Sequence, residues 1–60
     1  MIQSRFQQAN TARNMIRQAY REGLTDDDEV VARAIELAGK DAAGMIGRVF
    51  TREFVLARAI

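Results

Sequence analysis

The sequence has no cysteine and no histidine among its 60 residues. A chain without them has no disulfide bond, no usual zinc site, and no thiol or imidazole for nucleophilic or acid–base catalysis. Proline is absent as well, and no apolar run approaches the roughly 20 residues that a transmembrane helix requires. We therefore expect a soluble cytoplasmic protein that is not an enzyme, does not enter a membrane, and binds no cofactor, metal or small molecule.

The length of the chain limits it to one domain, residues 1–60. Size scaling gives a buried surface of about 5,800 Å², and its apolar part supplies on the order of 85 to 90 kcal/mol. Ordering the chain costs about 90 kcal/mol. Because the two terms cancel, we expect a homodimer or a complex with a partner protein.

Apolar side chains that recur at steps of three and four residues predict three helices, over residues 2–22, 26–38 and 42–59. Gly23 and Gly39 follow the first two helices and are typical helix stops. No alternating strand pattern is present. The sequence therefore predicts an all-α fold, a small three-helix bundle with antiparallel consecutive helices, which dimerisation or a partner completes.

The acidic stretch DDDE, residues 26–29, has two interpretations. With Thr25 as N-cap and Asp28 in a capping box, its carboxylates serve the free N–H groups of the second helix. Four consecutive acids point around a helix instead of converging, which argues against a divalent cation site. We expect Asp41 to cap the third helix in the same way.

Two glycines, Gly44 and Gly47, lie within the predicted third helix, where each costs about 1 kcal/mol relative to alanine. Together with Ala42 and Ala43 they make a smooth surface on which another helix can lie close. A loosely wound first turn is the alternative, and the sequence leaves both open.

Two charged residues lie at the centre of apolar stripes, Arg13 on the first helix and Glu53 on the third. The stripes are formed by Ile2, Phe6, Ala9, Ile16 and Tyr20, and by Ile46, Phe50, Ala57 and Ile60. Neither charge has an opposite charge three or four positions away. In a bundle with parallel first and third helices, both lie about 16 Å from the helix start, which predicts a salt bridge inside the core. The alternatives are contacts across a dimer interface and, for Glu53, a role as general base.

Charge is distributed in blocks, with a net charge of +3 over residues 1–23, −4 over residues 24–41 and +2 over residues 42–60.

Met15 and Val55 are apolar residues on the polar faces of their helices, and Val55 lies there with Arg48. We take these three as a candidate partner surface. The function expected is a small protein–protein interaction module, a regulator or inhibitor that binds a partner protein or itself.

The alternative is a helix-turn-helix DNA-binding regulator that uses the second and third helices around Gly39. Its candidate phosphate contacts are Arg5, Arg17, Arg21, Arg48 and Arg52. The predicted reading helix opens with two alanines and a glycine, which offer bases no hydrogen bond, and the preceding helix begins with acids. Nucleic acid is therefore the second choice of partner.

The stretch REGL at the end of the first helix, followed by an acidic link and VVA, resembles the small helical antitoxins that inhibit Fic-type AMP-transferring toxins. Glu22 and Gly23 match their motif. Those inhibitors carry a Ser or Thr four residues before the glutamate, a position that Gln18 occupies here. The resemblance implies an inhibitor that binds a partner enzyme, and we assign no family from it.

Overall fold

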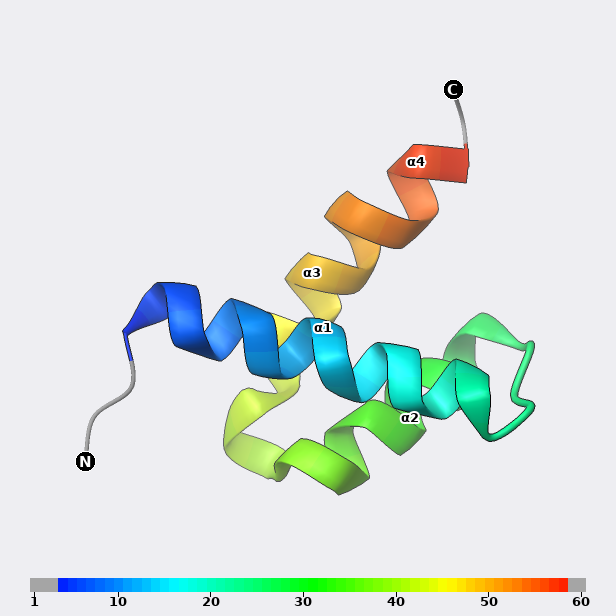
Figure 1. Ribbon diagram of the computed structural model, residues 1–60, viewed down its shortest axis with the longest axis horizontal. Coiled ribbons are helices and arrows are strands. Elements are labelled where there is room, and N and C mark those ends of the chain that lie inside the picture. The colour runs from blue at the N-terminus through cyan, green and yellow to red at the C-terminus, as the bar shows by residue number, and fades with distance from the viewer. Residues whose placement is uncertain (1–3, 59–60) are drawn as a thin grey trace.

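The computed structural model describes residues 4–58, and most of them are helical (Figure 1). In chain order the elements are α1 (Arg5–Arg21), α2 (Asp27–Ala38), a 3₁₀ turn (Lys40–Ala42), α3 (Ala43–Phe50), a π turn (Thr51–Val55) and α4 (Leu56–Arg58). The last three elements form one continuous helical path, residues 43–58, which we call the third helix. The described part of the chain contains no strand, and the predicted all-α fold of three helices is confirmed.

Local hydrogen bonds set both ends of α1. The Ser4 hydroxyl accepts from the backbone N–H of Gln7, and the Gln7 side chain accepts from the N–H of Ser4, both at 3.1 Å. This capping box begins the helix at Arg5, and residues 2 and 3 of the predicted helix lie outside the described residues.

The predicted stop at Gly23 is confirmed. Its φ of 97° is left-handed, and its N–H donates to the carbonyl of Tyr20. The N–H of Leu24 donates to the carbonyl of Ala19. These two bonds form a Schellman motif, in which glycine is favoured because it has no Cβ.

The cap of α2 differs from the predicted one. Asp26, not Thr25, is the N-cap, and its carboxylate accepts from the N–H groups of Asp28 and Glu29. Asp28 is therefore at the second helical position and forms no capping box with Thr25. One carboxylate oxygen of Asp26, Oδ1, accepts from both free N–H groups, which starts the helix one residue later. The stop predicted at Gly39 is confirmed, with φ 99°.

The start of the third helix also differs from the prediction. A 3₁₀ turn precedes α3, its N-cap is Ala42, and no side chain caps it. Asp41 lies inside the 3₁₀ turn and is not the cap. This turn gives the chain a tight reversal after Gly39, and α3 then continues from Ala43.

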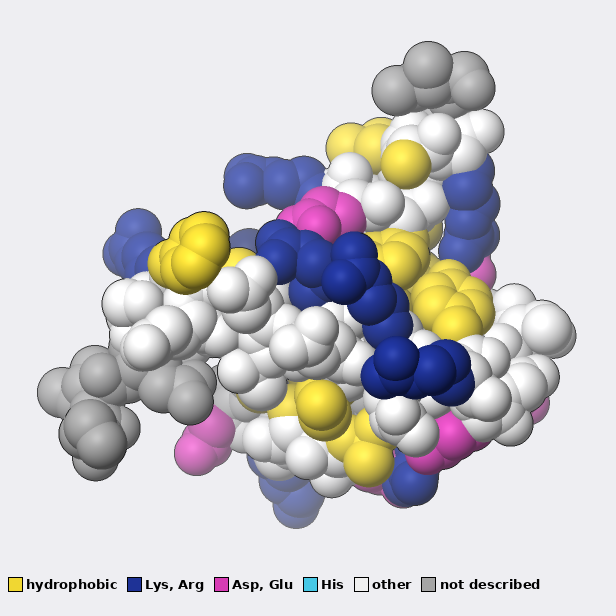
Figure 2. Space-filling view, in the orientation of Figure 1, with side chains coloured by type: hydrophobic (Ala, Val, Ile, Leu, Met, Phe, Trp, Pro, Cys, Tyr) yellow, Lys and Arg dark blue, Asp and Glu magenta, His cyan; other side chains and the backbone are white. Residues whose placement is uncertain are grey.

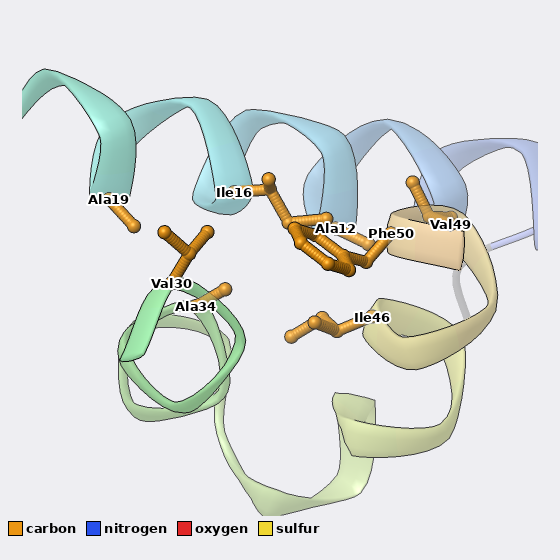
Figure 3. Close-up of a cluster of buried hydrophobic side chains, with 8 residues drawn as sticks. All are labelled: Ala12, Ile16, Ala19, Val30, Ala34, Ile46, Val49 and Phe50. Atoms are coloured by element: carbon orange, nitrogen blue, oxygen red, sulfur yellow. The ribbon is translucent and has the colours of Figure 1, made fainter. Parts of the chain in front are cut away.

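Eight apolar side chains form the core, each at most 5% exposed (Figure 3). They are Ala12, Ile16 and Ala19 of α1, Val30 and Ala34 of α2, and Ile46, Val49 and Phe50 of α3. Burial of an isoleucine or valine contributes about 1.5–3 kcal/mol, and the alanines let the helices approach closely. No polar or charged side chain of the described residues is buried.

The buried stripe of α1 differs in part from the predicted one: Ile16 is buried as expected and Ala9 packs against the core, while Ile2 lies outside the described residues. Phe6 is 75% exposed and Tyr20 is half-buried, whereas Ala12 and Ala19 are fully covered. The large apolar side chains placed the centre of the predicted stripe at a different angle around the helix from the observed centre. Small residues such as alanine carry little weight in a hydrophobic pattern, although they pack most tightly.

The first helix lies across the other two. In Figure 1, α2 runs back beneath α1 while the third helix leaves α1 at a steep angle. In Figure 3, α1 runs across the view and α2 is seen nearly end-on. The prediction that the first and third helices are parallel is therefore wrong. The C-terminal half of the third helix extends beyond α1 and α2, which leaves part of its surface uncovered (Figure 1).

Candidate functional site

The π turn changes which side chains of the third helix face the core. A π turn bonds residue i to i+5 and holds one residue more than an α turn, so the residues after it are rotated by roughly 100°. Phe54 consequently packs against the core, and Ala57, predicted on the buried stripe, is exposed. The same rotation places Leu56 on the outside, where it is 55% exposed. Ile60 lies outside the described residues.

An aromatic row secures this rotated segment. The rings of Phe50 and Phe54 stack with centroids 5.8 Å apart, and Phe54 stacks on Tyr20 of α1 at 5.9 Å. The guanidinium of Arg58 lies 5.9 Å from the centroid of the Phe50 ring. Arg58 also donates to the Asp27 carboxylate at 3.0 Å and to the Tyr20 hydroxyl at 2.8 Å. The end of the third helix is thus tied to both α1 and α2.

Arg13 and Glu53 form the salt bridge that their sequence positions suggested. Arg13 Nε donates to Glu53 Oε1 at 2.5 Å and Nη2 to Oε2 at 2.7 Å, while Nη1 donates to the Asn10 side chain. These bonds hold the pKa of Glu53 below its ordinary value, and the charges of Arg17 and Arg52 act in the same direction.

The predicted position of this pair inside the core is wrong. The side chains of Arg13 and Glu53 are 25% and 38% exposed. Two rotations account for the difference. Arg13 lies at the edge of the stripe centred on Ala12, Ile16 and Ala19, and the π turn moves Glu53 off the centre line of the third helix. The two residues meet where the helices cross, not along parallel axes.

The three residues of the predicted partner surface do not form one exposed patch. Met15 is partly buried and packs against the core, because it lies three residues after Ala12 and four before Ala19 on the inner side of α1. Val55 is 36% exposed and Arg48 is exposed, both on the third helix. The placement of Met15 on an outer polar face is therefore wrong.

The uncovered side of the third helix is a shallow depression that we call the outer face. It is lined by Ala43, Gly44, Gly47, Arg48, Thr51, Arg52 and Leu56. A Cβ built on Gly44 or Gly47 would meet nothing within 4 Å. Both glycines have helical backbone, because the left-handed glycines of the described chain are Gly23 and Gly39 alone. No contact within the described residues accounts for a glycine at either position. The sequence pattern pointed to this smooth surface, but Leu56 joins it only through the π turn.

A second hollow, of about 330 Å³, adjoins the outer face where α1 crosses the third helix. It is lined by Arg5, Ala9, Met45, Arg48, Val49, Arg52 and Glu53. No acid among residues 4–58 forms an ion pair with Arg5, Arg48 or Arg52. The one acid in this hollow, Glu53, already has both oxygens bonded to Arg13. Three cations therefore gather here without an ion pair of their own, although Arg52 lies near enough to Glu53 to lower its pKa.

The other arginines predicted as nucleic-acid contacts are placed differently. Arg17 lies near enough to Glu53 to lower its pKa, so it belongs to the basic surroundings of the hollow. Arg21 lies in the last turn of α1 and lines neither hollow. Figure 2 shows a band of Lys and Arg side chains across the middle of the view, with an acidic group against its upper end and further Lys and Arg side chains at the margins.

Glu22, which carries the resemblance of the REGL stretch, has partners inside the chain. It is the C-cap residue of α1, and its carboxylate accepts from Arg33 Nε at 2.8 Å and from the Gln18 side chain. The hydrogen bonds from Arg33 lower the pKa of Glu22. This glutamate thus joins α1 to α2.

No protein-family model matches this sequence, and neither the curated proteins nor the solved structures contain a match. None of the described helices has the length and apolar character needed to cross a bilayer.

Proposed function

We propose that the protein is a protein–protein interaction module that binds its partner through the outer face. The observation that carries this proposal is the pair Gly44 and Gly47. Each glycine lowers the stability of a helix by about 1 kcal/mol relative to alanine, and no neighbour within the described chain requires its small size. A surface that another backbone approaches closely is the physical reason for such residues.

Exposed apolar surface supports the same proposal. Leu56 is 55% exposed and lies on the outer face. Val55, beside it in sequence, is 36% exposed. Interfaces bury apolar anchors at their centre and surround them with polar groups, and the arginines 48 and 52 supply such a rim. We also propose that the protein acts in the cytoplasm, as a regulator or inhibitor of its partner.

A nucleic acid fits the outer face less well. At the exposed start of the third helix, Gly44 has no side chain that could contact a base. A phosphate backbone would also leave Leu56 without an apolar partner. The two arginines of this face, Arg48 and Arg52, supply only a weak, salt-sensitive attraction to phosphates.

Photo-crosslinking in the cells that produce the protein tests the proposal. A photoreactive amino acid replaces Leu56 in one variant and Leu37 in another, because Leu37 is also exposed but lies on α2. We expect discrete protein adducts from position 56 and none of the same mass from position 37. An adduct of twice 6.7 kDa identifies a second copy as the partner.

Three outcomes contradict the proposal. They are the absence of any adduct from position 56, identical adducts from both positions, and the loss of the adducts on treatment with nuclease. The last of these supports the DNA-binding alternative.

A further inference from the structure

We propose that the outer face receives an acidic amphipathic α-helix of the partner protein. This inference rests on the proposed function and adds the kind of segment that is recognised. Three properties of the outer face define this helix: two glycines in its floor, two arginines that form no ion pair within residues 4–58, and an exposed leucine at one end.

The floor selects a helix. Gly44 and Gly47 lie three residues apart, on one side of α3 and about 4.5 Å apart along its axis. Small residues allow helix axes to approach toward the short end of the usual 8–10 Å. A partner strand needs a sheet edge, which residues 4–58 do not offer. A helix needs none, because its backbone hydrogen bonds are satisfied internally.

The cations select carboxylates. Arg48 and Arg52 are four residues apart and lie one turn from each other along the third helix. Arg5 reaches the same hollow from α1. Arginine binds carboxylates in a bidentate geometry, as Arg13 does with Glu53. A partner helix with Asp or Glu at the same four-residue spacing supplies the missing counter-charges.

The exposed leucine gives the segment its length and its apolar side. Leu56 is twelve residues beyond Gly44, a rise of about 18 Å, which a partner helix of roughly twelve residues spans. Such a helix needs an apolar residue over Leu56 and small residues over the glycines. Acidic residues then flank this stripe on the side of Arg48 and Arg52.

A second copy of this chain is a poorer occupant. Two outer faces related by a two-fold axis place arginines against arginines, which is repulsive. The acidic start of α2 is partly engaged, because Asp26 caps its helix and Asp27 binds Arg58. The occupant that remains is a helix from another protein.

Selection from a displayed helix library tests the inference without a known partner. The library randomises one face of a 14-residue helix with no charge bias, and the whole chain is the bait. We expect selected helices to be net acidic, with Asp or Glu spaced by four residues beside an apolar stripe. Selection against R48E/R52E should enrich Lys and Arg instead. The matched control bait is R21E, which reverses an exposed arginine outside both hollows and should select the same helices as the wild type.

Affinities of a selected helix, measured by fluorescence anisotropy, complete the test. We expect R48Q to bind about tenfold more weakly and G47L at least tenfold more weakly, while R21Q binds like the wild type. Circular dichroism shows whether each variant is folded. Any one of four results overturns the inference. These are selected helices that are neutral or basic, no selected helix at all, equal binding by R48Q and R21Q, and tighter binding to a 20-base-pair DNA duplex. When crosslinks from position 56 persist despite such a result, the proposed function stands and only the acidic helix is lost.

Discussion

Replacing Gly44 and Gly47 together by alanine should make the isolated protein more stable. Both residues lie in α3, and the added methyl groups meet nothing within 4 Å. Alanine is favoured over glycine in a helix by about 1 kcal/mol, so the double substitution contributes about 2 kcal/mol. A chain of this length gains about 0.13 kcal/mol/K of entropy on unfolding, and the melting temperature should therefore rise by about 16 °C.

Thermal and urea unfolding, followed by circular dichroism at one protein concentration, measure this change. The chain provides its own control in Gly23 and Gly39, whose φ values of 97° and 99° disfavour any side chain. Alanine at either of these positions should lower stability by about 1–2 kcal/mol. A gain in stability from alanine at Gly44 and Gly47, together with a loss from alanine at Gly23 or Gly39, would indicate that the outer face has no neighbour in the free protein.

A lower melting temperature for the Gly44 and Gly47 double variant would refute this reasoning. It would mean that the added methyl groups meet an atom in the isolated protein. A loss that grows with protein concentration would identify that neighbour as a second copy, because dimer stability depends on concentration.

The remaining expectations concern the ion pairs. Glu53→Gln should lower the urea midpoint only slightly and leave the protein folded at 25 °C, because its salt bridge is partly exposed; an unfolded variant would indicate a buried charge. The pKa values of Glu53 and Glu22 are depressed in the folded state, so stability should be constant above their ordinary value of 4.5 and fall as the pH drops below it. Urea melts from pH 7 to 3 should show a shallower fall for E22Q/E53Q, and an unchanged slope would contradict the assignment. Arg58→Ala should speed amide hydrogen exchange over residues 51–58 but not in α2, whereas equal protection would show that Arg58 holds nothing in place.

Features that depend on neighbouring residues were predictable from the sequence. The stops at Gly23 and Gly39 follow from the positive φ needed at the end of a helix. Glycine meets this need because it has no Cβ. The residue types alone also suggested a smooth surface at Gly44 and Gly47, although they left a loosely wound first turn open as the alternative. The cap of α2 was misplaced by one residue because Thr25 and Asp26 can both serve, and the choice depends on which side chain reaches the free N–H groups.

Features that depend on the path of the third helix were not predictable in this way. A uniform 100° rotation per residue placed Glu53 at the centre of the apolar stripe, but the π turn rotates Phe54 there instead. No sequence signal marked the turn. The salt bridge between Arg13 and Glu53 was found because both charges lacked a partner on their own helix, although the parallel geometry assumed for it was wrong.

The π turn also affects how this chain can be compared with others. A helix that is α-helical throughout reaches the same point with one residue fewer, so equivalent positions before and after the turn are offset by one. In an ungapped alignment with such a helix, Phe54 and Arg58 of this chain stand opposite residues that point in another direction. A gap of a single residue within residues 51–55 restores the correspondence. Comparisons that penalise gaps inside helices will therefore separate this chain from relatives that lack the extra residue.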